Sequence, residues 1–476
     1  MNSLDSAMTA ACNETFTENG MKAYNSSLNA IVDLFFEFGG NRGNSNAVLS
    51  LFQAAVAEDL DLAVRVALYG RDVRGGMGER EHFRTILTYF ARSNPTDAVK
   101  LIPLVPSVGR FDDLFAFIDT PVESNALDFY THALREGNGL AAKWCPREKS
   151  SQRRIASKLR RHIGLSPRDF RKLLVSATNV VESKMCSNEW TDIDYSKVPS
   201  LSMIRNIQAF VRHDPYGIEE FKKGLDNGTT KVNAGAVYPH QVVRSIFTND
   251  ERVSEHQWKA LPNWIPEGKS FIPVVDTSGS MMCACDDAGT SAIDVSVGLG
   301  LYCAMKAKGE FQNKMLTFNS KPSWIDVSGL SLNNAVRKTA NANWGMTTNI
   351  ELTYNLILQA AVNNAVPQSD MPDYLIIFSD MQFDAATSGA NKIIPNMRER
   401  FEQAGYEMPK VVFWNLRGKT TNETVPVTYD EHGTALVSGF SPALLKSVLS
   451  DSLDDFTPFN VVLEAVSDNK YNWLNT

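Results

Sequence analysis

The amino-acid sequence predicts a chain of two parts: an N-terminal array of α-helices over residues 1–265 and a doubly wound α/β domain over residues 266–476. Three observations lead to this prediction. A chain of 476 residues is too long for one ordinary hydrophobic core. Apolar residues recur at helical spacing in the first part. In the second part, short apolar runs alternate with helix-like stretches.

Helical periodicity is clear in the first part. Phe83, Ile86, Leu87 and Phe90 recur at the spacing of one apolar helix face, and the same spacing returns over residues 170–177. Short breaks that contain Gly, Pro or Asn separate these helical stretches. Successive amphipathic helices with short turns favour an irregular helical solenoid, because no clean repeat period is present.

The second part alternates between strand-like and helix-like stretches. This alternation predicts a mainly parallel sheet with helices on both faces. A further short run, "SWIDVSG", suits an antiparallel edge strand. The expected strands are "SFIPVVD", "KMLTFN", "DYLIIFSD" and "KVVFWNLR", and the expected helices span 291–309, 331–342, 349–365 and 391–404.

Composition narrows the class of protein. The hydrophobic fraction of 43% and the charged fraction of 21% are typical of a globular protein, and the net charge of −7 gives no global sign of nucleic-acid binding. The six cysteines are too few and too scattered for a disulfide framework, so Cys283 and Cys285 are expected to be reduced structural residues. No signal peptide or membrane span is expected, which predicts a cytoplasmic protein.

Polar residues gather where the expected strands end. Asp276, Ser278 and Ser280 follow the run "FIPVV", Thr348 opens a helix, and Asp380 ends the run "LIIFS". In doubly wound sheets, ligands bind beyond the carboxyl ends of the strands. Two carboxylates with three hydroxyls suit a small hard cation, so the sequence predicts Mg²⁺ or another divalent cation. Such a site would attract an acidic group of a protein partner as its last ligand.

These residues resemble the D-x-S-x-S motif and its companions in von Willebrand factor A domains, the metal-ion-dependent adhesion site (MIDAS). The resemblance implies a Rossmann-like fold in which both serines and Thr348 bind magnesium directly or nearly so. Asp276 and Asp380 would then act largely through water. Asn349 stands where many relatives have aspartate, which is a mild departure.

An enzymatic alternative remains open at the same corner. An apolar strand that ends in Asp276 also resembles haloacid-dehalogenase-type phosphotransferases, in which this aspartate is the nucleophile. Those enzymes carry a second aspartate two residues later as the general acid. Ser278 occupies that position and cannot shuttle a proton near neutral pH, so a non-enzymatic protein is expected.

A strongly basic stretch lies within the helical part. Residues 143–172 hold eleven Lys or Arg against two acids, inside a chain of net charge −7. Such a stretch favours contacts with RNA phosphates or another polyanion. The alternative is a solvated helix face, or one paired with acids elsewhere in the fold. The candidate RNA-binding residues here are Lys143, Arg147, Arg153, Arg154, Lys158, Arg160, Arg161, Arg168, Arg171 and Lys172.

A glycine-rich segment supplies weaker candidates. "YGRDVRGGMGERE" places Arg71, Arg74 and Arg80 around three glycines, but the Gly-Lys-Ser/Thr ending of a phosphate-binding Walker loop is absent. A turn between two helices is the more favoured interpretation, and a phosphate cradle is the alternative.

The order of the two parts resembles the TROVE/Ro family of RNA-binding proteins. That resemblance implies HEAT-like helical repeats that could close into a ring with the A domain. It also implies a ribonucleoprotein with small noncoding or misfolded RNA as partner. A nearer resemblance, over almost the whole chain, is to an uncharacterised family of plants, fungi, bacteria and phages. The other hypothesis is a metal-dependent protein–protein adaptor without RNA binding. Motifs of the nearer family include "TENG" (17–20), "RDVRGGMGER" (71–80), "VGRFDDLF" (108–115) and "VVDTSGSM" (274–281).

Overall fold

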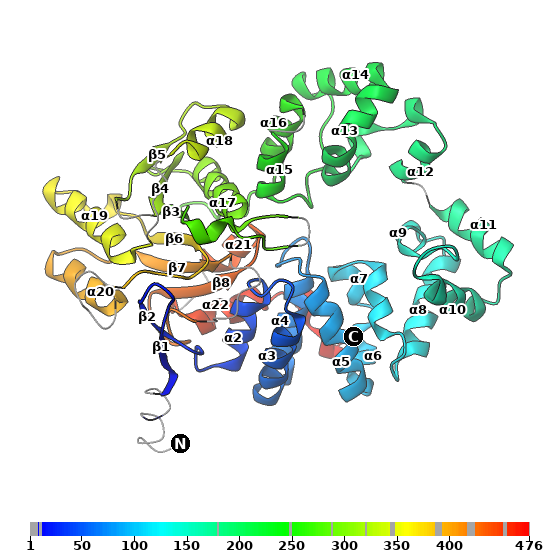
Figure 1. Ribbon diagram of the computed structural model, residues 1–476, viewed down its shortest axis with the longest axis horizontal. Helices are drawn as coiled ribbons and strands as arrows, with labels where there is room; N and C mark the ends of the chain where they lie inside the picture. The colour runs from blue at the N-terminus through cyan, green and yellow to red at the C-terminus, as the bar shows by residue number, and fades with distance from the viewer. Residues whose placement is uncertain are drawn as a thin grey trace. The chain divides into compact units, whose positions relative to one another are not determined.

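The chain forms two compact units in the computed structural model (Figure 1). We call Met1–Asp59 with Val237–Ala465 the α/β unit, and Leu60–Ala236 with Val466–Thr476 the helical unit. The change of sequence rhythm expected at residue 265 does not coincide with this division. The structure describes residues 8, 12–178, 180–246, 250–286, 289–318, 321–342, 348–385, 393–416, 424–450 and 455–475.

A six-stranded sheet forms the centre of the α/β unit. Its strand order is β5-β4-β3-β6-β7-β8, and every neighbouring pair is parallel except β4 with β5. This confirms the predicted mainly parallel sheet with an antiparallel edge. Strands β3 and β6 are buried at every position, as expected for the middle of a covered parallel sheet. The strands are β3 (Phe271–Asp276), β4 (Lys314–Phe318), β5 (Trp324–Asp326), β6 (Tyr374–Ser379), β7 (Lys410–Asn415) and β8 (Thr434–Ser438).

Helices cover this sheet, and the four predicted ones are present as α17 to α20. Helix α17 packs across β3, β4 and β6, whereas α2 and α22 pack on β8. The helices are α2 (Ala30–Phe38), α3 (Ser45–Glu58), α15 (Pro239–Ser245), α16 (Glu251–Lys259), α17 (Ala292–Lys306), α18 (Leu332–Ala340), α19 (Ile350–Asn363), α20 (Ile393–Gln403), α21 (Leu444–Val448) and α22 (Pro458–Ala465), with 3₁₀ turns η4 (Gly279–Met282) and η5 (Gln368–Asp370).

The contact between α15 and α17 depends on a glycine. A Cβ atom at Gly298 would lie 2.7 Å from the Cα of His240, which is closer than real Cβ contacts allow. The backbone of α15 therefore reaches α17 only because this position lacks a side chain. His240 is fully buried, and burial lowers its pKa to about 3, so its ring is neutral and packs against Phe440.

A short hairpin precedes the helices of the α/β unit. Strands β1 (Glu14–Phe16) and β2 (Lys22–Tyr24) pair antiparallel, with the "TENG" residues between them. Gly20 has a φ of +88°, a left-handed conformation that favours glycine. No periodic pattern in the sequence indicates this hairpin.

The helical unit confirms the predicted series of amphipathic helices. Phe83, Ile86, Leu87 and Phe90 are buried on one face of α5, and consecutive helices such as α4 with α5 and α13 with α14 pack together. Its elements are α4 (Leu60–Arg71), α5 (Glu81–Ser93), α6 (Pro95–Leu101), α7 (Val105–Val108), η1 (Phe111–Phe117), α8 (Glu123–Arg135), α9 (Gly139–Trp144), α10 (Arg153–Ile163), α11 (Pro167–Ala177), α12 (Val181–Cys186), η2 (Trp190–Asp192), η3 (Tyr195–Lys197), α13 (Ser200–His213) and α14 (Pro215–Asp226). No helix among the described residues is both long and apolar enough to cross a membrane.

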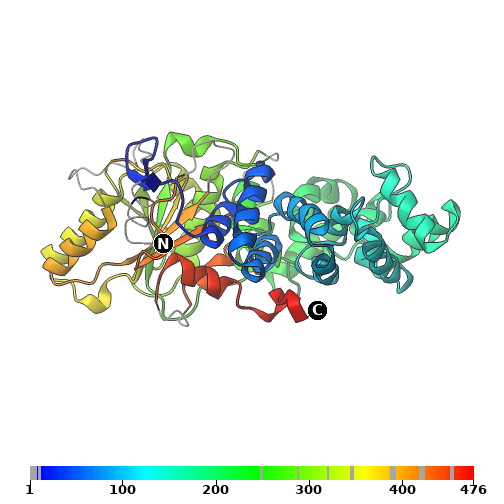
Figure 2. The same cartoon turned by 90° about the horizontal axis from the view of Figure 1, so that it is seen from below.

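The C-terminal segment belongs to the helical unit, although the chain reaches it through the sheet. Its two 3₁₀ turns, η6 (Asn469–Tyr471) and η7 (Trp473–Asn475), pack on α4 and α6 (Figures 1 and 2). The Tyr471 hydroxyl donates a hydrogen bond to Asp72, and the Lys470 ammonium lies 2.7 Å from the same carboxylate. The helical unit therefore needs the last residues of the chain.

Replacing Trp473 by alanine should destabilise the helical unit by about 3–5 kcal/mol. The Trp473 side chain is fully buried and meets the ring of Phe90 edge-on at 6.2 Å between centroids, so its loss leaves a cavity. Chemical denaturation followed by circular dichroism measures the change. Leu474→Ala is the matched control, because its side chain is 48% exposed. Equal stability of the two variants would contradict this packing.

Candidate functional site

The predicted metal-site residues converge at the carboxyl edge of the sheet. From β3 the chain runs outward through β4 and β5, and it then returns to the other side of β3 to form β6. The strand order thus reverses between β3 and β6, the place where ligands bind in doubly wound sheets. Asp276 ends β3 and Asp380 directly follows β6, so both carboxylates lie at this point, which we call the β3–β6 corner.

Asp276 is buried at the centre of this corner. Its carboxylate accepts hydrogen bonds from the Ser379 hydroxyl at 2.5 Å and from the Ser278 backbone N–H at 2.9 Å. Burial, and after it the nearby charge of Asp380, together raise the pKa of Asp276 to about 7, because they outweigh the hydrogen bonds that lower it. Two acids this close in a buried setting repel each other unless a proton or a cation lies with them.

The predicted hydroxyls lie around the two acids. Ser278 and Ser280 have their hydroxyl oxygens 3.1 Å apart, and Ser280 is exposed while Ser278 is buried. The Thr348 hydroxyl donates to the carbonyl of Gln382 at 2.6 Å, which ties it to the loop that follows Asp380. The structure therefore brings all five predicted residues to one corner.

Asn349, which follows Thr348, caps a helix. Its side-chain oxygen accepts a hydrogen bond from the N–H of Leu352 at 2.9 Å and caps α19. A neutral amide performs this capping as well as a carboxylate does. This cap fixes the start of α19 directly after Thr348.

The chemistry of the corner suits a hard cation. Carboxylate and hydroxyl oxygens are the ligands that Mg²⁺ takes, and a cation would remove the repulsion between Asp276 and Asp380. Thr277, which directly follows Asp276 in the chain, has a buried hydroxyl that makes no hydrogen bond with the described residues. The described residues contain no cluster of three or more His, Cys, Asp or Glu, so a cation here would need the hydroxyls.

Two cysteines lie beside the corner: Cys283 is exposed and Cys285 is buried. Both are free thiols. Burial raises the pKa of Cys285 to about 12, so it stays protonated near neutral pH, and its thiol donates to the carbonyl of Leu416 at 3.4 Å.

The raised pKa of Asp276 predicts a pH dependence of stability. Because the folded state keeps a proton that the unfolded chain loses near pH 4, the free energy of unfolding without divalent cation should fall as pH rises from about 4 to about 7. Asp276→Asn should remove this part of the dependence. Asp33 and Asp384, whose pKa values burial also raises, are present in both proteins and cancel in the difference. Parallel stability curves for the two proteins would contradict the assignment.

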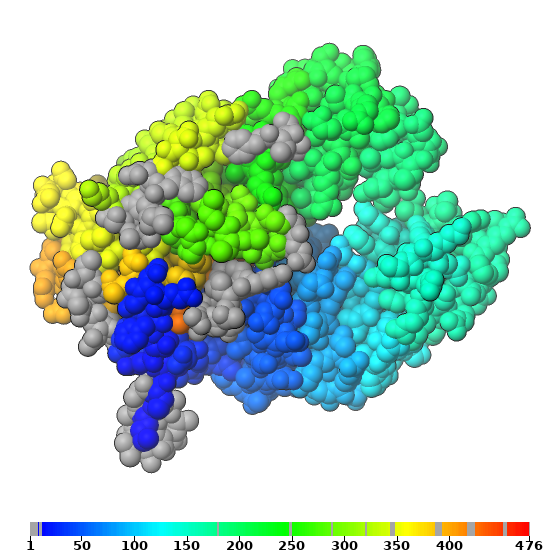
Figure 3. All heavy atoms as spheres, viewed as in Figure 1, coloured from blue at the N-terminus to red at the C-terminus, as the bar shows by residue number. Residues whose placement is uncertain are grey.

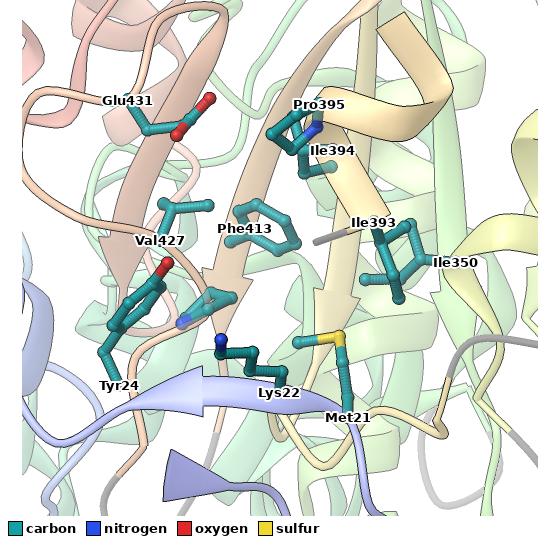
Figure 4. A pocket seen from close by; sticks show the side chains of 11 residues that line it. Met21, Lys22, Tyr24, Ile350, Ile393, Ile394, Pro395, Phe413, Val427 and Glu431 are labelled. Atoms are coloured by element: carbon teal, nitrogen blue, oxygen red, sulfur yellow. The ribbon is translucent and has the colours of Figure 1, made fainter. Parts of the chain in front are cut away.

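A cavity opens near the same edge of the sheet (Figure 4). Its walls are mainly apolar, and its charged side chains are engaged elsewhere: Lys22 with Glu14 and Glu431 with Arg398. Its lining comprises Met21, Lys22, Tyr24, Ile350, Ile393, Ile394, Pro395, Phe413, Pro426, Val427 and Glu431.

Part of the basic stretch is neutralised within the helical unit. Arg154 and Lys158 pair with Asp119, and Lys158 also reaches Glu123 at 2.6 Å. Arg160 pairs with Glu148 at 2.7 Å. For these three cations the structure thus supports the alternative to RNA binding given above, in which the basic residues pair with acids elsewhere in the fold. Lys143 is also 4.0 Å from Glu182.

The remaining cations of the stretch form an exposed set, which we call the free cations. They lie on and beside α10 and α11, whose surface is drawn in cyan to green in Figure 3. None forms an ion pair with the residues that the structure describes, and each side chain is exposed. Lys149 joins this set beside the predicted residues. The free cations are Arg147, Lys149, Arg153, Arg161, Arg168, Arg171 and Lys172.

The prediction that Arg71 binds RNA phosphate is wrong, because this side chain is buried. Its side chain is 2% exposed, and its guanidinium lies 2.8 Å from the buried carboxylate of Asp113. It joins the glycine-rich segment to η1 and cannot reach a ligand. Arg74 stays exposed, and Arg80 pairs with Glu81 at 2.7 Å.

The glycine-rich segment itself forms a tight turn between α4 and α5. A Cβ atom at Gly76 would lie 2.0 Å from the carbonyl oxygen of Tyr69, so only glycine fits. The turn thus supports the interpretation that the sequence favoured, and the glycines serve close packing.

Comparison with known proteins gives relatives without an assigned activity. Two family models, both described as domains of unknown function, match the chain: DUF2828 over residues 17–114 and 147–267, and DUF7788 over residues 270–471. The "Uncharacterized protein L728" of Acanthamoeba polyphaga mimivirus is 30% identical over 510 aligned residues, which cover 95% of this chain and 87% of the viral protein.

A solved structure is similar at lower identity. The crystal structure of the Ro (RSR) protein of Deinococcus radiodurans matches with a TM-score of 0.47 and 13% identity, over 87% of this chain and 93% of that one. These values are too low to transfer an activity to this chain.

Proposed function

The chain belongs to the family of the uncharacterized mimiviral protein, and we propose that it is a non-enzymatic protein that holds Mg²⁺ at the β3–β6 corner and binds RNA through the free cations. No activity comes with that family, so the proposal rests on this chain's own side chains. In this proposal the sheet and its corner are a von Willebrand A domain, and the helices are HEAT-like repeats.

One observation carries the metal half of the proposal: two buried acids, Asp276 and Asp380, repel each other. The hydroxyls of Ser278 and Ser280 follow Asp276 in the chain, and the Thr348 hydroxyl is bonded to the loop after Asp380. Bound Mg²⁺ would supply positive charge that accepts an acidic group of a partner. Ser278, Ser280 and Thr348 would offer neutral oxygens, which leave the cation with net positive charge. Ser280 lies on the exposed side of the corner, where a partner has access.

The free cations support the RNA half. Arg168, Arg171 and Lys172 lie within two turns of α11, and Arg153 and Arg161 lie on α10. None is neutralised by an acid among the described residues, so contacts with phosphates would release counterions without first breaking an ion pair.

A second candidate, a metal-dependent protein adaptor, is favoured by the ion pairs of Arg154, Lys158 and Arg160, which weaken the basic surface. Filter binding of labelled single-stranded and structured RNAs over a range of salt concentrations separates the two. We expect affinity that falls steeply with salt. Absence of affinity at low salt would leave the adaptor.

Phosphoryl transfer through Asp276 is the third candidate and the weakest. The position of the required general acid holds Ser278, whose hydroxyl lies 3.1 Å from that of Ser280. A serine hydroxyl cannot act as a general acid near neutral pH. We therefore assign Asp276 to cation binding.

A further inference from the structure

The "TENG" segment lies against the loop that carries Asp380. Thr17 donates through its hydroxyl to the carbonyl of Phe383 at 2.5 Å, and Asn19 donates through its amide to the carbonyl of Gln382 at 2.7 Å. Backbone bonds extend the contact: the N–H of Ala385 donates to the carbonyl of Asn19 at 3.1 Å. Residues more than 360 positions apart in sequence thus form one hydrogen-bonded layer.

The other side of the same loop holds Thr348. The backbone carbonyl of Gln382, which accepts a hydrogen bond from the Asn19 amide, also accepts one from the Thr348 hydroxyl. Two more hydrogen bonds join Thr348 to Asp384. The Thr348 N–H donates to the Asp384 carboxylate at 2.7 Å, and the Asp384 N–H donates to the Thr348 carbonyl at 2.9 Å. The loop after β6 therefore lies between the "TENG" segment and a candidate metal ligand.

The loop is also linked to Asp380 and anchored in the core. The N–H of Gln382 donates to the Asp380 carboxylate at 3.2 Å. The ring of Phe383 is fully buried between Phe318 and Phe413, with centroids 5.8 Å and 5.7 Å away. Both Asp380 and Thr348 thus take their positions from a loop whose outer face is bonded to residues 17–19.

We propose that the "TENG" segment is a positioning element of the metal site, with Thr17 and Asn19 as its positioning residues. It holds the loop after β6 so that Thr348 and Asp380 face the cation together, and it touches no cation itself. This inference rests on the proposed cation site. It assigns to the N-terminal hairpin a role in ligand affinity in addition to packing. Partners that orient metal ligands typically change affinity by about 10–100-fold when they are lost.

Isothermal titration of the full chain with Mg²⁺ and with Ca²⁺ tests this role. Thr17→Val keeps the shape and removes the hydroxyl, whereas Thr17→Ser keeps the hydroxyl and serves as the matched control. We expect Thr17→Val and Asn19→Ala to weaken Mg²⁺ binding by about tenfold, and Thr17→Ser to bind like the wild type. Mg²⁺ should lose more affinity than Ca²⁺, because the larger ion tolerates a looser geometry.

The possible outcomes distinguish the positioning role of Thr17 and Asn19 from the proposed Mg²⁺ binding at the β3–β6 corner. If Asp276→Ala abolishes binding while Thr17→Val and Asn19→Ala bind like the wild type, the positioning role is wrong and the metal site stands. Equal losses for Mg²⁺ and Ca²⁺ would indicate a general structural role and overturn the inference. If the wild type binds neither ion, the proposed site and the inference both fail. Asn19 is exposed, so Asn19→Ala decides the matter if Thr17→Val does not fold.

Discussion

Asp276→Ala should reduce Mg²⁺ affinity by about 100-fold or more, since it removes one of the two carboxylates at the β3–β6 corner. The remaining hydroxyls are neutral and cannot offset the cost of taking a divalent ion out of water. Asp380→Ala should have a similar effect, because Asp380 is a second buried acid, 6% exposed, at the same corner. Isothermal titration measures both variants against the wild type.

A matched control removes one acid from elsewhere in the α/β unit. Glu310 is exposed, so Glu310→Gln changes the net charge equally and should bind Mg²⁺ like the wild type. A metal-free measurement adds an independent check: Asp276→Asn should raise the melting temperature near pH 7.5, since it removes a buried repulsion with Asp380. Unchanged Mg²⁺ affinity in both alanine variants would contradict the site.

Neutralising three free cations together should weaken RNA binding by about tenfold or more. The triple variant Arg168→Gln, Arg171→Gln and Lys172→Gln removes three expected phosphate contacts, all of them on α11. The slope of log affinity against log salt should then become shallower by about 2, from roughly 0.7 for each phosphate contact to single-stranded RNA. Filter binding over a range of salt concentrations gives both quantities.

The basic stretch offers a matched control with the same loss of charge. Arg154→Gln, Lys158→Gln and Arg160→Gln together remove three cations that already pair with acids of the fold. These exposed or half-exposed pairs contribute little stability, so this variant should fold. It should also lose less RNA affinity than the other triple variant. Equal losses would show that net charge, and not the free cations, governs binding.

Much of the fold and of the corner could be predicted from sequence, for a physical reason. Buried parallel strands read as continuous apolar runs, and their carboxyl ends must meet at one edge of the sheet. Asp276 and Asp380 each follow such a run, so their meeting follows from topology alone. Thr348 opens a helix on the same side, and its placement follows in the same way.

The contacts that escaped prediction join segments far apart in the sequence. Nothing in "TENG" indicates that Thr17 bonds Phe383, because the donors are backbone and small polar groups without a periodic pattern. The same holds for the C-terminal Tyr471, which reaches Asp72 across most of the chain. Such partners are set by the tertiary fold, which local periodicity does not encode.

Charge patterns were misleading where the fold supplies partners. Arg71 reads as an exposed arginine beside glycines, yet Asp113 pairs with it in the interior. Lys158 appears in the sequence as part of a basic stretch, yet it forms ion pairs with Asp119, which lies before α8, and with Glu123, the first residue of α8. A run of like charges therefore gives an upper bound on the free charge, and the structure is needed to find which cations remain available.

Anomalous diffraction from crystals soaked in Mn²⁺ tests the central claim most directly, because Mn²⁺ takes the oxygen ligands of Mg²⁺. The account predicts one dominant peak at the β3–β6 corner, beside the hydroxyls of Ser278, Ser280 and Thr348 and close to Asp276 and Asp380. A peak elsewhere, or no peak at the corner at saturating Mn²⁺, would contradict it.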